Sequence, residues 1–196
     1  MKLLIKLFLL MTVPMLYACD PLGGLPPYYD YHLQLSFQDI SGNDLVKGID
    51  LDEMWNHNAG IVTSEEDATG GAVRPDQFDL GIVFRNPDLY FGKMPSSGIV
   101  KVDRLKFQKR EDYYYLELRT SSRDTKPPET KITFRMICPH VFGDNIEHDI
   151  VTYWKRDSKR KRTQLCHRIE LDGKEFSKIT YEQHNQISIA VLTVDY

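Results

Sequence analysis

The chain has 196 residues, of which 41% are hydrophobic and 27% are charged, and it contains 12 Gly and 10 Pro. This balance excludes a collagen, a coiled coil and an intrinsically disordered chain. The formal net charge is −3 at pH 7. Such a chain lacks the excess of Lys and Arg that neutralises phosphates, so nucleic acid is not an expected partner.

Residues 1–18 have the pattern of a secretory signal peptide. Lys2 and Lys6 make the start positive, residues 7–16 form an apolar run, and the small residue Ala18 ends the segment. An apolar run of about ten residues spans only about 15 Å as a helix, which is half of a bilayer's hydrocarbon core. We therefore predict a leader that directs export and does not itself span the membrane.

Cys19 follows this leader directly. Residues 16–19 (LYAC) resemble a bacterial lipobox, in which the cysteine is acylated and becomes the new N-terminus after cleavage. The resemblance implies that Cys19 is a lipidation site and that the protein is anchored to a membrane of the bacterial cell envelope, which we predict to be the outer membrane, on its periplasmic or its surface side. Two or more acyl chains hold a protein durably on a bilayer. The alternative is an ordinary signal peptide that ends in a cysteine.

Residues 19–27 comprise Cys19 and a Gly- and Pro-rich stretch, DPLGGLPP. This composition has no hydrophobic periodicity and predicts a flexible tether. We expect residues 28–196 to form one folded domain.

Alternating apolar and polar residues begin at residue 31 and predict a half-buried strand, with Tyr31, Leu33, Leu35 and Phe37 on one face and His32, Gln34 and Ser36 on the other. The same pattern, or a short apolar run, predicts strands at 78–84, 99–107, 113–119, 132–136, 146–154, 165–171 and 186–194. The last of these is apolar on both faces and is expected to be central. Asp172 and Gly173 predict a tight hairpin from 168–171 to 174–176.

No segment shows a sustained helical period, and Gly- and Pro-containing turns separate the expected strands. Eight or nine short strands with such turns predict an all-β protein, an antiparallel β-sandwich of Ig-like or prealbumin-like type. Residues 33–49 resemble the first strand and turn of carboxypeptidase-regulatory-like and other prealbumin-type modules. The whole chain also resembles the small lipoproteins of Bacteroides, which implies an envelope location and no particular activity.

Residues 50–77 depart from the β pattern because they mix acidic residues, three glycines and a few apolar residues. A long loop in a compact domain is either functional or poorly ordered. Trp55, with His57 and Asn58, makes this segment a candidate ligand loop. The alternative is an insertion whose Trp55 packs on a sheet edge.

Tyr113 and Tyr115 are expected to point outward from the strand at 113–119. Exposed aromatic rings stack on sugars in glycan-binding sandwiches, and tyrosine is frequent at protein interfaces. Together with Trp55 they define a candidate ligand face. The alternative is cross-strand aromatic pairing on a partly covered sheet.

His140, Asp144 and His148 lie close together in the sequence. Imidazole and carboxylate groups are ligands that zinc accepts, but their spacing matches no zinc motif and a polar turn explains them equally. They are weak metal candidates, and no metal or other cofactor is expected.

Cys138 and Cys166 are the two cysteines beyond Cys19. An oxidising envelope permits a disulfide between them. The alternation of side chains between the two faces of a strand opposes a disulfide. Cys138 is expected on the same face as the core residues Phe134 and Met136, whereas Cys166 is expected on the face opposite to Ile169. A disulfide and two buried thiols both remain open.

A basic run at residues 155–162 is expected to form a hairpin loop and contains Lys155, Arg156, Lys159, Arg160, Lys161 and Arg162. Such a run attracts anionic lipid headgroups or acidic polysaccharide. The alternative is a solvated loop whose charges prevent edge-to-edge pairing of strands.

Catalytic motifs are absent from the sequence: there is no G-x-S-x-G nucleophile elbow and no Gly-rich phosphate loop. We therefore expect a lipid-anchored binding or interaction module of the envelope, without catalysis, whose ligand is a glycan or a partner protein. The alternatives are an envelope hydrolase that uses loop carboxylates, which keeps an enzyme open, and a structural subunit of an outer-membrane assembly.

Overall fold

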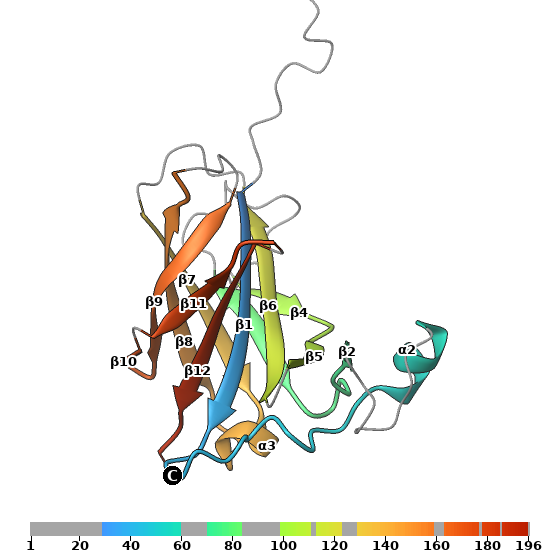
Figure 1. Cartoon of the computed structure of the whole chain (residues 1–196). Helices are drawn as coiled ribbons and strands as arrows, with labels where there is room; N and C mark the ends of the chain where they lie inside the picture. The colour runs from blue at the N-terminus through green and yellow to red at the C-terminus, as the bar shows by residue number, and fades with distance from the viewer. Residues whose placement is uncertain are drawn as a thin grey trace, which may run out of the picture.

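The computed structural model describes residues 29–59, 70–83, 99–110, 113–122, 129–158, 163–176, 178–184 and 186–195. Within them, twelve strands form two sheets of six strands each (Figure 1). The predicted all-β sandwich is confirmed. The number of strands is higher than the eight or nine expected, because short strands add to both sheets.

The first sheet has the spatial order β11 (Ile179–Glu182), β12 (Ile187–Thr193), β1 (Tyr29–Gln38), β6 (Tyr113–Ser122), β5 (Lys106–Arg110) and β2 (Gly70–Ala72). The second sheet has the order β10 (Lys174–Phe176), β9 (Gln164–Leu171), β8 (His148–Arg156), β7 (Glu129–Ile137), β3 (Asp79–Val83) and β4 (Ile99–Val102). Neither β2 nor β11 has a pattern of its own that predicts it.

The first and last strands lie side by side at the centre of the first sheet. β1 pairs with β12 in parallel and with β6 in antiparallel orientation, and all other strand pairs are antiparallel. The prediction that residues 186–194 form a central strand is confirmed.

The core lies between the sheets and contains the side chains that alternation assigned to it. Tyr31, Leu33 and Leu35 of β1 are fully buried. The ring of Tyr31 meets Trp154 of β8 edge to face, with 5.3 Å between ring centroids. The buried Trp154 Nε1 donates a hydrogen bond of 2.7 Å to Thr152 Oγ1, so its polar atom is satisfied within the core.

Residues 99–107 form two strands where one was expected. β4 pairs with β3 in the second sheet and β5 pairs with β6 in the first, so the chain changes sheets between Val102 and Lys106. Leu105 is fully buried at this crossing. A period-two pattern cannot reveal such a crossing, because the apolar side chains point into the same core from both sheets.

A β-bulge in β9 overturns the parity argument for Cys166. Tyr153 pairs with Arg168, but the next residue, Trp154, pairs with Cys166, which leaves His167 as an extra residue. The extra residue places Cys166 on the same buried side as Ile169 although the two are three positions apart.

Two short helices occur, which the sequence pattern did not predict. Asp52 caps the N-terminus of α2 (Glu53–Asn58), because its side chain accepts a hydrogen bond from the Trp55 backbone N–H. α3 (Pro139–Phe142) closes one end of the sandwich, where Phe142 meets Phe37 with 5.4 Å between ring centroids. Among the residues described, no helix has the length and hydropathy needed to cross a membrane.

Candidate functional site

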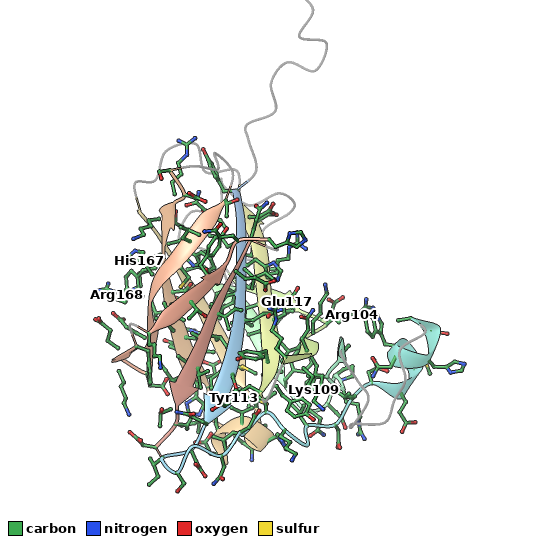
Figure 2. All side chains as sticks on the ribbon, viewed as in Figure 1. Arg104, Lys109, Tyr113, Glu117, His167 and Arg168 are labelled. Carbon is green, nitrogen blue, oxygen red and sulfur yellow. The ribbon has the colours of Figure 1, made fainter. Side chains whose placement is uncertain are left out.

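The candidate site lies on the outer face of the first sheet, meaning the face turned away from the second sheet. Strand register places its residues: Glu117 of β6 is opposite Gln34 of β1 on one side and opposite Lys106 of β5 on the other. Further along the same strand pair, Gln108 is opposite Tyr115. Directly opposed residues of an antiparallel pair point to the same face, so these side chains share one surface. Figure 2 shows Tyr113 and Glu117 along β6.

Glu117 is the centre of a polar network on this face. His32 Nε2 lies 3.2 Å and Lys106 Nζ lies 3.4 Å from its carboxylate oxygens. Gln108 Nε2 also donates to the carboxylate, at 3.4 Å. Burial alone would raise the pKa of Glu117, but His32 and then Lys106 outweigh burial and lower that pKa to about 2. Glu117 is therefore a carboxylate throughout the physiological pH range.

Gln34 and Ser36 of β1 extend the network and are fully buried although they point away from the core. Gln34 Nε2 donates to Gln108 Oε1 at 2.8 Å, which links β1 to β5 above the intervening β6. Gln34 Oε1 and Ser36 Oγ have no hydrogen-bond partner among the described residues. The outer face thus contains unused hydrogen-bonding capacity below its surface side chains.

The predicted ligand face is divided by the fold. Tyr113 and Tyr115 lie on the outer face, as expected, but Tyr115 is only 8% exposed, so the face is no open aromatic strip. Trp55 lies on α2, beyond the β2 side of the sheet and apart from the two tyrosines (Figure 1). The Arg104 guanidinium is 5.0 Å from its ring centroid.

The three weak metal candidates do not form one site. His148 donates from Nδ1 to Asp172 at 2.7 Å and from Nε2 to Asp144 at 3.0 Å, whereas His140 Nε2 contacts the Lys47 carbonyl at 3.0 Å. Both nitrogens of His148 are occupied, so neither offers a lone pair to a metal. In the described ranges, no three His, Cys, Asp or Glu side chains are grouped as a metal site requires.

Cys138 and Cys166 are free and buried, so the disulfide that the sequence allowed is not formed. Cys166 is opposite Trp154, which is opposite Thr130 at the far end of β7 from Cys138. About eight residues along a strand correspond to roughly 26 Å, and disulfide-bonded Cα atoms lie within about 7 Å. Burial raises the pKa of Cys138, and raises that of Cys166 to about 12, so both are poor nucleophiles.

The start of the basic run lies at the same end of the sandwich as the start of β1. Lys155 and Arg156 are exposed at the end of β8. Arg156 pairs with Gln164, and the adjacent Thr163 forms a parallel bridge with Asp30. Cys19, the tether and residues 159–162, with Lys159, Arg160, Lys161 and Arg162, lie outside the described residues.

The sequence placed His32 and Gln34 on the outward face of the first expected strand but did not reveal the cluster that they form with Glu117, Lys106 and Gln108. A run of polar residues on the outer faces of 32–36 and 115–119 was the available signal. What joins them is the pairing of β6 with the neighbouring β5 and with β1, which lies far away in the sequence. The chain matches no protein-family model, no curated protein and no solved structure.

Proposed function

We propose that this protein is a lipid-anchored, non-catalytic binding module of the bacterial cell envelope, and that the outer face of its first sheet binds a glycan. The observation that supports the proposal is the network around Glu117. Its amide, imidazole, ammonium and carboxylate groups are held at fixed positions by strand pairing. Sugar hydroxyls both donate and accept hydrogen bonds, and this network supplies donors and acceptors on one rigid surface.

The accessible members of the network define the binding surface. Lys106 is exposed, while His32, Gln108 and Tyr113 are partly exposed. Tyr113 presents an aromatic ring beside these polar groups, the combination of apolar body and polar rim that sugar rings require. The buried members, such as Gln34, act from below by orienting Gln108.

The chemistry of Glu117 favours binding over hydrolysis. A glycosidase needs a general acid whose pKa is raised so that the carboxyl group is protonated at working pH. The pKa of Glu117 is lowered to about 2. The residue is suited to hold Lys106 and Gln108 in position and unsuited to donate a proton to a leaving group.

The position of the basic run is compatible with a lipid anchor on Cys19. We infer that lipid on Cys19 and the tether hold the Tyr29 end of the sandwich towards the bilayer. The exposed Lys155 and Arg156 lie at that end. Each such cation near an anionic surface strengthens association by about fivefold.

Glycan binding is tested by titrating the full-length protein with peptidoglycan fragments and with neutral and acidic envelope polysaccharides, using a calorimeter. Gln108→Ala and Tyr113→Ala should each weaken binding at least tenfold. Tyr153→Ala is the matched control, because Tyr153 is a partly exposed tyrosine of β8 in the other sheet. Absence of binding to every glycan, or equal losses in all three variants, would contradict the proposal and direct the search to a protein partner.

The anchor is tested separately in cells. Cys19→Ala should move the protein from the membrane fraction to the soluble fraction, and continued membrane association would refute lipidation. Lys155→Gln together with Arg156→Gln should weaken binding of the lipidated protein to vesicles that contain phosphatidylglycerol by about twentyfold, with no effect on vesicles of phosphatidylcholine alone. Equal effects on both vesicles would refute the electrostatic contact.

A further inference from the structure

A small cavity lies at the edge of the sandwich, where β6 continues beyond the end of β5. β5 pairs only with the first half of β6, up to Glu117. From Leu118 onward, no described strand covers the side of β6 that faces away from β1. Here β4 of the second sheet approaches β6, and the cavity between them has a volume of about 160 Å³.

The floor of this edge cavity is apolar and reaches the core between the sheets. It consists of Leu80, Ile82, Val102, Leu118 and Phe134. Apart from the half-buried Val102, these side chains are at most 5% exposed. An apolar cavity of about 150 Å³ lined by such residues stays dry and accommodates a benzene-sized molecule. Because this volume includes the mouth, the floor fits an apolar group of at most about six carbon atoms.

The mouth of the edge cavity is positively charged. Arg104, Lys106 and Arg119 line it and are exposed, against the single carboxylate of Glu117. Glu117 is already paired with His32 and Lys106. Within the described part of the chain, Arg119 has no carboxylate partner, and Arg104 only faces the ring of Trp55. Two guanidinium groups are thus available to an anion at the entrance (Figure 2 labels Arg104 and Glu117).

We propose that the edge cavity binds an apolar monoanion, a carboxylate whose hydrophobic part of about five carbon atoms enters the floor while the carboxylate meets Arg104 and Arg119. Charge complementarity selects this class: a neutral apolar molecule leaves the guanidinium groups unused, and a polar anion leaves the floor empty. Guanidinium groups form paired hydrogen bonds with carboxylates, which fixes the orientation of the ligand. The cavity adjoins the glycan surface and shares Lys106 and Glu117 with it, but neither Gln108 nor Tyr113 lines the cavity.

The test is a titration of the full-length protein with a series of linear carboxylates, followed by NMR of the Leu, Ile and Val methyl groups. Affinity should rise about fourfold for each methylene from butanoate to hexanoate and then level off, since each buried methylene adds a constant free energy until the floor is full. The shifted methyl signals should be those of Leu80, Ile82, Val102 and Leu118. Hexanol should bind several-fold more weakly than hexanoate.

Two variants test separately how the floor and the mouth of the edge cavity contribute to binding. Val102→Phe should abolish hexanoate binding by filling the cavity, whereas Lys101→Phe, on the opposite face of the same edge strand and outside the lining, should leave it intact. Arg119→Gln, at an exposed position where folding should persist, should weaken hexanoate about threefold to fivefold without changing hexanol. Arg156→Gln is its control.

Three results would overturn the proposal: no methyl shift at millimolar hexanoate, equal affinity for hexanol and hexanoate, or continued growth of affinity well beyond hexanoate. None of them bears on glycan binding, which Gln108→Ala and Tyr113→Ala report. Failure of one proposal can therefore be told apart from failure of the other.

Discussion

Among the described residues, His32 and His148 each contact a carboxylate, and the two surroundings differ in which partner is buried. In the Glu117 network the carboxylate is the buried group: the Glu117 side chain is 4% exposed and that of His32 is 16% exposed. At the end of the second sheet, His148 is the buried group, with a side chain 12% exposed between Asp144 and Asp172, which are 42% and 48% exposed.

The buried group of each cluster has a shifted pKa. His32 and Lys106 lower the pKa of the buried Glu117 to about 2. Burial acts to lower the pKa of His148, but Asp172 and then Asp144 outweigh it and raise that pKa. Because both ring nitrogens of His148 donate to carboxylates, the geometry is that of an imidazolium, whose ring stacks on Phe142 at 4.0 Å between centroids. The Glu117 network is thus built around an ionised carboxylate, and the His148 cluster is built around a protonated imidazole.

Glu117→Gln should have the largest effect. It removes the charge that His32 and Lys106 surround and leaves the rest of the side chain in place, so the free energy of unfolding should fall by about 2 kcal/mol. Urea unfolding measures this. Glu175→Gln is the control, because Glu175 is exposed and lies 3.8 Å from Arg168. In this variant the free energy of unfolding should fall by less than about 0.5 kcal/mol. Equal losses in the two variants would mean that the outer-face network adds nothing to stability.

The pH dependence of the Glu117→Gln effect sharpens the contrast. The pKa of Glu117 is about 2 in the folded protein against an ordinary value of 4.5. A lowered pKa adds stability that is present above pH 4.5 and is lost as the pH falls towards 2. The stability difference between the wild type and the variant should shrink as the pH falls below 4.5. A difference that persists unchanged at pH 2.5 would show that packing, and not charge, stabilises the network.

His148→Gln should have a smaller effect with the opposite dependence on pH. The raised pKa of His148 adds stability that is fully present below about pH 6.5 and is lost as the pH rises through the folded-state value. Because Asp144 and Asp172 are half exposed, the loss at pH 6 should be about 1 kcal/mol or less. Thermal unfolding at pH 6 and pH 8.5 tests this, and Asp144→Asn should reproduce part of the effect. A larger loss at pH 8.5 than at pH 6 would contradict it.

Alternation along single strands predicted the sandwich well. Leu33, Leu35 and Phe134 were assigned to the core from period-two patterning, and all are at most 1% exposed. Their burial depends only on the geometry of one strand, which sequence neighbours determine. The same reasoning placed Tyr113 on the outer face.

Contacts between distant strands could not be predicted in this way. Glu117 meets Lys106 and His32 because three strands pair in one register, and a shift by one residue would turn each side chain to the other face. The bulge at His167 and the change of sheet between Val102 and Lys106 are likewise set by tertiary packing. The candidate site depends on these pairings, so the sequence showed its members but not their proximity.

His140→Gln should have the smallest effect and completes the comparison of the histidines. His140 is exposed and has a single contact to a backbone carbonyl, at 3.0 Å, with no carboxylate beside it among the described residues. Such a hydrogen bond competes with water, so the free energy of unfolding should change by less than about 0.5 kcal/mol in urea at pH 6. A loss as large as that of His148→Gln would show that ring hydrogen bonding stabilises this end of the sandwich without the two aspartates. If His140→Gln loses little stability, the contribution of His148 to the free energy of unfolding comes from its charge and its burial against Phe142.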